Sequence, residues 1–353
     1  MKNKVYTMTF HWATNYGAVV QAYALQKCLE QMGCDVEIIN YVPRKHKKTL
    51  LRCFRTRKLW TVRKQVQEYI KERKIEIFRQ RYLRRTKCFS NNGQLMNEKW
   101  GQATYICGSD QIWNPYFTMQ GEGIPTSAYY LEFAPEDSNK FAYAASFGTD
   151  EISESMQKFI KDLLLRFRKI SVRENTAKRI VKDLKLEAIV VCDPVFLLER
   201  NQYEIFADDS PNSKGKLFSY ILHEKQETAR VIGTYVAENL RLEAVDERSW
   251  TIEQWLGNIK NAEFVITNSF HATAFALIFH IPFITVLVSE SGMNDRIQTL
   301  LENMSLKNRM IENFNEEQIN EAIKSDIDWK YVDYKILQMR ESSMDFLSDI
   351  CEL

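Results

Sequence analysis

The 353-residue sequence lacks the patterns that identify several common classes of protein. It has no run of about 18 apolar residues of the kind that spans a bilayer, since polar residues and a proline interrupt the longest apolar stretch, 264–288. Its amino terminus shows no secretory signal. The seven cysteines form no CxxC pair and no cluster with histidine, which argues against a disulfide framework or a zinc site. We therefore expect a cytoplasmic protein.

Familiar catalytic motifs are also absent. There is no GxGxxG or GxxxxGK[ST] phosphate loop, no HExxH helix and no GxSxG turn. No DxD-like pair of carboxylates follows an expected strand, since Asp208-Asp209 falls in a polar stretch. The sequence thus predicts neither a metal site nor a bound cofactor.

What the sequence does contain is a repeated alternation of strands and helices. An expected strand at 5–10, a helix at 17–32 ending before Gly33, and a strand at 36–41 form a βαβ unit, which implies a parallel sheet. The alternation continues to residue 192, and a second series follows from 217 to 288. A polar stretch around 198–216 is the best linker. The predicted fold class is α/β, with two Rossmann-like, doubly wound domains facing a cleft.

The predicted domains are 1–198, which carries a helical insertion at 44–89, and 216–325. The helices of 326–353 are expected to pack back on the first domain. The insertion is strongly basic: 44–87 holds 18 Lys and Arg against 3 acids, although the whole chain has a net charge of only +2. An apolar stripe is expected at Val62, Val66, Ile70 and Ile77. The segment is either a solvated helix surface or a patch for an anionic partner such as a membrane; no nucleic-acid motif accompanies it.

Two loops in the first domain carry candidate binding residues. Asn15, Tyr16 and Gly17 open a helix whose free N–H groups suit an anion, although a plain capped helix has the same pattern. Directly after a strand come Ser109, Asp110, Gln111, Trp113 and Asn114. These side chains are able to hydrogen-bond a sugar, with Trp113 as a stacking face. The alternative is a capped turn with Trp113 in the core.

Two further loops carry candidate catalytic residues. Arg173 ends an expected strand and suits a phosphate or a carboxylate, unless it pairs with Glu174 or stays solvated. In the second domain, Asn268, Ser269 and Phe270 lead into His271, in the first turn of a helix. Histidine there is suited to general acid or base chemistry, although many first-turn histidines are structural.

Taken together, five segments resemble the polysaccharide pyruvyl transferase family. They are, in chain order, Gly108 to Pro115, Ala144 to Gly148, Ser171 to Glu174, Cys192 to Leu198 and Thr267 to His271. The resemblance runs from the Asn15 loop to the region of Arg296. One departure is Ala272, where many relatives have glycine.

The resemblance implies a fold like that of the GT-B glycosyltransferases. It also implies phosphoenolpyruvate as donor, a sugar hydroxyl pair as acceptor, and a pyruvate ketal in a polysaccharide as product. His271 is then the general acid and Arg173 a cation for the donor, which Asn268, Ser269 and Phe270 also bind on the side of the second domain. The loops at Asn15 to Gly17 and Ser109 to Asn114 take the acceptor, a free, nucleotide-linked or lipid-linked glycan. Alternatives are a glycosyltransferase with a nucleotide-sugar donor and a non-catalytic glycan-binding protein.

Overall fold

The computed structural model describes residues 3–44, 59–119, 125–209, 212–222, 226–245, 251–288 and 294–351. The chain divides into two compact units. The first contains 1–197 and 340–353, and the second contains 198–339. Each unit is described by itself.

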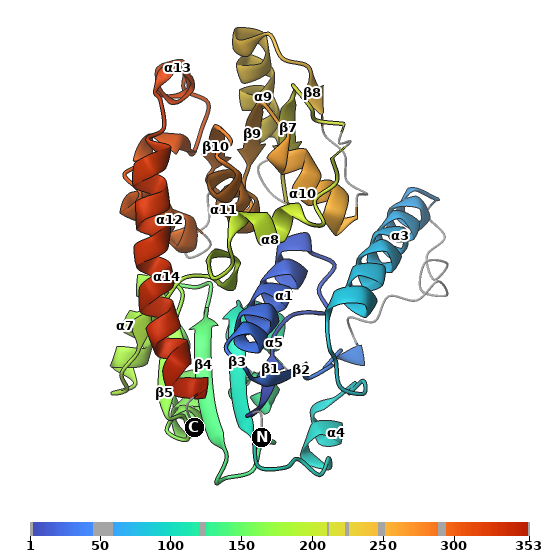
Figure 1. The fold of residues 1–353 in the computed structure, drawn as a ribbon, viewed down its shortest axis with the longest axis vertical. Helices are drawn as coiled ribbons and strands as arrows, with labels where there is room; N and C mark the ends of the chain where they lie inside the picture. Colours follow the sequence, from blue (N-terminus) through green and yellow to red (C-terminus); the bar gives the residue numbers. More distant parts are fainter. Residues whose placement is uncertain are drawn as a thin grey trace. The chain divides into compact units, whose positions relative to one another are not determined.

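The first unit is built on a parallel sheet. Among the described residues it has six strands in the order β2-β1-β3-β4-β5-β6, and Figure 1 shows β5, β4, β3, β1 and β2 side by side. The strands are β1 (Lys4–Met8), β2 (Asp35–Ile38), β3 (Thr104–Asp110), β4 (Asn139–Ala145), β5 (Lys169–Val172) and β6 (Ile189–Val190). The helices are α1 (Tyr16–Gln31), α3 (Leu59–Tyr82), α4 (Asn92–Met96), α5 (Pro115–Thr118), α6 (Glu154–Leu164) and α7 (Asn175–Asp183), with short 3-10 turns at η2 (Ser127–Tyr130) and η3 (Pro194–Phe196).

The second unit is built on another parallel sheet. Its described strands follow the order β11-β10-β9-β7-β8. They are β7 (Leu217–Tyr220), β8 (Ala244–Val245), β9 (Phe264–Thr267), β10 (Phe283–Val286) and β11 (Met310–Ile311). The helices are α8 (Arg200–Glu204), α9 (Gln226–Leu240), α10 (Ile252–Lys260), α11 (Phe270–Phe279), α12 (Asp295–Asn303), α13 (Glu316–Lys324) and α14 (Trp329–Cys351), with a 3-10 turn at η4 (Lys307–Arg309).

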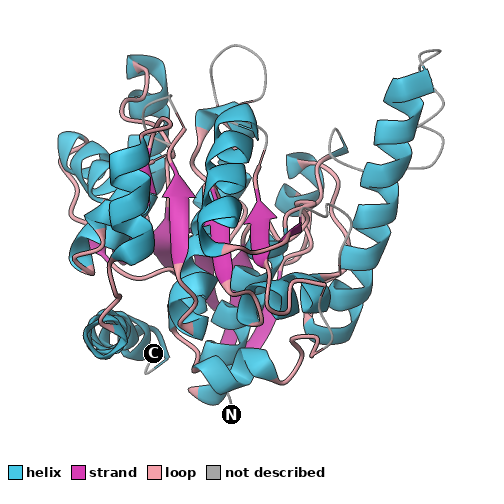
Figure 2. Ribbon diagram, turned by 90° about the horizontal axis from the view of Figure 1, so that it is seen from above, coloured by secondary structure: helices cyan, strands magenta, loops and turns pink. Residues whose placement is uncertain are grey.

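The central strands are apolar on both faces because helices cover both sides of a parallel sheet. Every residue of β9 and of β10 is buried. In Figure 2 the magenta strands are surrounded by cyan helices. Polar side chains are therefore concentrated at the ends of the strands, where the loops begin.

The last turns of α14 belong to the first unit. Ser343 accepts a hydrogen bond from the backbone N–H of Cys192 at 2.9 Å, and Nε of Arg340 donates to the carbonyl of Phe196 at 2.7 Å. Both contacts support the chain just after β6. No helix among the described residues is long and apolar enough to cross a membrane.

Helix α3 corrects one expectation for the basic insertion. Of that insertion, 45–58 lies outside the described residues. The predicted apolar stripe is wrong, because Ile70 and Ile77 are 45% and 63% exposed. The side that packs on the first unit instead carries Ile75 and Phe78, both fully buried.

Candidate functional site

The carboxyl end of β3 positions the first group of polar residues. The strand runs on to Asp110, which pairs with Ala145 of β4, so Ser109 and Asp110 belong to the strand itself. Gly108 makes this approach possible, since a Cβ there would lie 2.0 Å from the carbonyl oxygen of Tyr143. Ser109 is fully buried, and its hydroxyl donates to the carbonyl of Ala144 at 3.0 Å. Its side chain is therefore held in the interior by the backbone of β4, and acceptor binding at Ser109 stays a prediction.

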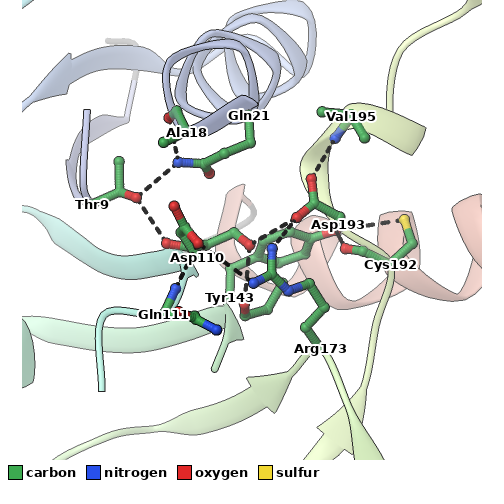
Figure 3. Close-up of polar contacts among 12 residues, drawn as sticks. Thr9, Ala18, Gln21, Asp110, Gln111, Tyr143, Arg173, Cys192, Asp193 and Val195 are labelled. Carbon is green, nitrogen blue, oxygen red and sulfur yellow. Dashed lines mark hydrogen bonds and ion pairs between the residues drawn. The ribbon is translucent and has the colours of Figure 1, made fainter. Parts of the chain in front are cut away.

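Arg173 lies at the centre of this group. Its side chain is 2% exposed and forms ion pairs with Asp193 at 2.5 Å and with Asp110 at 3.5 Å. Figure 3 shows the guanidinium reaching both carboxylates. Burial opposes the positive charge, but Asp193 and Asp110 outweigh it and raise the pKa of Arg173 above its ordinary value. Arg173 is thus a buried ion-pair residue whose partners include Asp193 and Asp110, and the nearby charge of Glu174 also raises its pKa.

Asp193 is a member of this group that sequence reasoning missed as a site residue. It follows β6, caps η3 by accepting from the backbone N–H of Val195 at 3.1 Å, and lies 3.4 Å from the hydroxyl of Ser109. The available signal was the Asp193-Pro194 pair within a family-like segment. Asp193 therefore connects the ends of β3, β5 and β6 through buried polar contacts.

Two side-chain amides extend the group toward α5. The amide nitrogen of Asn114 donates to Oε1 of Gln111 at 3.4 Å, and both residues are buried. A Cβ on Gly148 would lie 2.5 Å from Nε2 of Gln111 and 2.6 Å from Nδ2 of Asn114. Among the described residues, Nε2 of Gln111 and Oγ of Ser146 are buried without a hydrogen-bond partner. A buried unpaired polar atom costs about 1–3 kcal/mol, so these two atoms are available to a water molecule or a polar ligand.

Two aromatic residues of the same loop, Trp113 and Tyr116, differ sharply in their exposure to solvent. Trp113 is fully buried, stacks on Tyr130 at 5.6 Å between ring centroids, and donates from its indole N–H to the carbonyl of Tyr129. The expected stacking face at Trp113 is therefore corrected to a core position. Tyr116 is instead 86% exposed, and its backbone N–H is held by Asn114 at 2.9 Å. The aromatic residue after Asn114-Pro115 was visible in the sequence, but its exposure was not.

The loop that opens α1 is fastened by α3. Asn15 caps the helix by accepting from the backbone N–H of Ala18 at 3.2 Å. Gly17 is buried in the first turn, and Tyr16 is fully buried with the ammonium of Lys71 at 4.4 Å from its ring centroid. All three residues therefore have the geometry of the capped-helix alternative, and their contact with the acceptor stays a prediction.

Arg79 and Glu72 of α3 form the hydrogen bonds that hold this loop. Arg79, 1% exposed, donates to the carbonyls of His11 and Ala13 at 2.7 and 2.8 Å. Glu72 accepts from the hydroxyl of Thr14 at 2.6 Å and from Arg79 at 2.6 Å. The conformation of this loop thus depends on α3, a helix that lies more than 40 residues later in the sequence.

His11 is not suited to proton transfer at neutral pH. It is fully buried, and its ring nitrogens lie 3.2 Å from the carbonyl of Thr9 and 3.1 Å from Oδ1 of Asn40. Burial lowers the pKa of His11 to about 4. The imidazole is therefore neutral at pH 7 and serves as a structural group.

In the second unit, the candidate residues gather where β9 passes into α11. Asn268 is paired with the backbone of Leu222, accepting from its N–H at 2.7 Å and donating to its carbonyl at 2.8 Å. Ser269 caps α11 by accepting from the N–H of Ala272 at 3.4 Å. These contacts make Asn268 and Ser269 residues that position the start of α11.

His271 occupies the second residue of α11 and is 6% exposed. The ring of Phe270 contacts it edge to face at 5.3 Å, and the guanidinium of Arg296 lies 5.7 Å from the Phe270 ring centroid. The helix N-terminus and Arg296 favour an anion near this turn.

Two parallel sheets with polar groups at the strand ends define a two-unit α/β protein. Residues 15–290 match the model of the family described as polysaccharide pyruvyl transferase. The match spans more than half of the sequence, so the chain belongs to this family, as its motifs predicted. A search of curated proteins finds no match.

Solved structures share the fold at low sequence identity. A glycosyltransferase from Rickettsia africae ESF-5 is 11% identical with a TM-score of 0.50, and the match covers 99% of this chain and 98% of that one. A UDP-N-acetylglucosamine 2-epimerase from Rickettsia bellii is 11% identical with a TM-score of 0.49, covering 98% of both chains. The predicted α/β class, with two Rossmann-like units on parallel sheets, is confirmed.

Proposed function

We propose that this chain transfers the pyruvyl group of phosphoenolpyruvate to two hydroxyls of a sugar, forming a pyruvate ketal in a capsule, exopolysaccharide or cell-wall glycan. The observation that carries the proposal is the family match together with a buried histidine in the first turn of α11. We assign the donor to the second unit, around Phe270 and His271, and the acceptor to the first unit, around Asp110, Gln111 and Asn114.

The reaction balances with one proton relay. His271 delivers a proton to the methylene carbon, which becomes a methyl group and leaves an oxocarbenium-like carbon. One sugar hydroxyl attacks this carbon and returns its proton to His271. The second hydroxyl displaces the phosphate, which takes up the second hydroxyl proton. No step calls for a metal or a further cofactor, and the positive end of α11 favours the departing phosphate.

The acceptor assignment is supported by the free polar groups of the first unit. Asp110 keeps its side chain 13% exposed while paired with Arg173, and the unpaired amide nitrogen of Gln111 lies beside it in the sequence. Sugar hydroxyls both donate and accept, so they suit a carboxylate next to an amide. We assign the transfer reaction to the cytoplasm, where phosphoenolpyruvate is made. The six described cysteines are free thiols, which supports this assignment.

The direct test combines ligand binding with product release. We expect phosphoenolpyruvate to raise the melting temperature of the purified chain and UDP- and GDP-sugars to leave it unchanged. A panel of sugar, nucleotide-linked and lipid-linked acceptors should then yield inorganic phosphate together with a glycan heavier by one pyruvyl group. A shift with a nucleotide sugar alone would favour a glycosyltransferase, and binding without phosphate release from any acceptor would favour a glycan-binding protein.

A glycine variant tests the acceptor assignment. Gly148→Ala is expected to raise the acceptor KM about 30-fold, because the new methyl group displaces the amides of Gln111 and Asn114, each worth about 1 kcal/mol as a hydrogen-bonding group. Gly215→Ala is the matched control, since Gly215 also has a positive φ but open space around its Cβ position. Both variants should lose about 1–2 kcal/mol of stability from the left-handed backbone. Equal acceptor KM values in the two variants would refute the assignment.

A further inference from the structure

The outward side of α3 carries a stripe of cations and isoleucines. Exposed side chains recur at three- or four-residue spacing, which places them along one face of the helix; they are Arg63, Gln67, Ile70, Arg73, Ile77 and Arg81. We call these six residues the α3 stripe. Figure 1 shows α3 running alongside α1, in agreement with its contacts with the first unit.

The acids of α3 do not neutralise the α3 stripe. Over 62–87 the sequence has ten Lys and Arg against three Glu. Glu72 is bonded to Arg79 and to the hydroxyl of Thr14, and Glu76 forms ion pairs with Arg79 at 3.2 Å and Arg85 at 2.7 Å. These two carboxylates are therefore used in holding the helix on the first unit. Glu68 is the third acid, and one carboxylate does not balance the exposed Arg63, Arg73 and Arg81, so the outward side keeps a positive charge.

The isoleucines of the α3 stripe are not needed to hold the helix in place. Phe78 packs against Tyr82 and Tyr23 at 4.5 and 6.1 Å between ring centroids, and Ile75 is fully buried beside them in the sequence. Ile77 is 63% exposed and Ile70 45%. Two β-branched apolar side chains placed between arginines on a solvated face are a feature that packing does not explain.

We propose that the α3 stripe binds an anionic lipid surface. Arg63, Arg73 and Arg81 suit lipid phosphates, and Ile70 and Ile77 suit the boundary between headgroups and acyl chains. The exposed Ile70 and Ile77 favour a lipid surface over an acidic polymer, because an acidic polymer would bind only the cations of the α3 stripe. The binding goes beyond the proposed transfer reaction and does not require it.

Vesicle co-sedimentation with the full chain tests the proposal. We expect binding to vesicles that contain phosphatidylglycerol, none to phosphatidylcholine alone, and a loss of binding as salt rises. Arg73→Gln should lower the partition coefficient about fivefold, the effect of about one cation near a charged membrane. Ile77→Ser should lower it by at least about as much, because an apolar side chain no longer enters the headgroup boundary. The matched controls are exposed positions elsewhere, Lys178→Gln on α7 and Ile205→Ser after α8, which is 83% exposed. They should bind like the unaltered chain, and circular dichroism should show that all four variants fold.

Three outcomes would overturn the proposal. The first is no binding to phosphatidylglycerol vesicles at low salt. The second is an equal loss in the control variants. The third is a loss with Arg73→Gln but not with Ile77→Ser, accompanied by equally tight binding to dextran sulfate, which would assign the α3 stripe to an acidic polymer. Because the readout is lipid binding, none of these results bears on phosphate release from phosphoenolpyruvate.

Discussion

Replacing His271 by alanine is expected to lower kcat/KM for ketal formation by about 10²–10⁴-fold, the usual contribution of a positioned general acid. The residue occupies the first turn of α11, whose start is held by the Ser269 cap and by the pairing of Asn268 with Leu222. The scaffold therefore does not depend on the imidazole. Phosphate release measured under donor and acceptor saturation gives kcat, and titration of each substrate gives its KM.

A second histidine on α11, His280, is a control for this variant. His280 ends α11, lies 2.7 Å from Asp333 and stacks on Trp329 at 4.9 Å between ring centroids. His280→Ala should change the melting temperature but not the pH profile of kcat. In His271→Asn, by contrast, the limb of the profile that reports the acid should disappear. Near-normal turnover in either His271 variant would remove this residue from the mechanism.

Replacing Arg173 by alanine is expected to reduce the free energy of unfolding by about 3–5 kcal/mol, the cost of leaving buried charges without their partner. Asp193 has a side chain that is fully buried, and Asp110 is only 13% exposed. Chemical denaturation measures the loss. Adding Asp193→Asn to the alanine variant removes one uncompensated carboxylate, so the double variant should recover part of the stability. A loss below about 1 kcal/mol in Arg173→Ala would contradict the buried ion-pair assignment.

A test of whether Arg173 binds the donor requires a variant that stays folded. Arg173→Lys keeps the charge but not the planar fork that reaches two carboxylates or a phosphate. If the guanidinium also binds the donor, as the sequence predicts, the KM for phosphoenolpyruvate rises while the acceptor KM is unchanged. An unaltered donor KM in a stable lysine variant would leave Arg173 as a positioning residue for Asp110.

Local patterns predicted the scaffold well. The βαβ opening, with its cap at Asn15 and its glycine stop at Gly33, depends on side chains close together in the sequence, so propensity and spacing are sufficient. The same holds for Ser269 at the start of α11. Helix α3 shows the limit: its inward side was predicted from isoleucine and valine spacing, but the chain buries Ile75, Phe78 and the charged Arg79 instead. Arg79 can be buried because two backbone carbonyls and a carboxylate accept its hydrogen bonds. The spacing of apolar residues in the sequence does not reveal these acceptors.

The sequence by itself determined the α/β class, the family and the strand ends at which polar side chains gather, because hydrophobic periodicity and short motifs are local properties of the chain. Only the tertiary structure decided which of those side chains stay accessible. Trp113 and Tyr116 are three residues apart, yet one is fully buried and the other 86% exposed, since Tyr130 provides a stacking partner for the first alone. Arg173 meets Asp193, 20 residues further on, through the pairing of β5 with β6. Burial and ion pairing depend on neighbours that are distant in sequence, and folding alone brings them together.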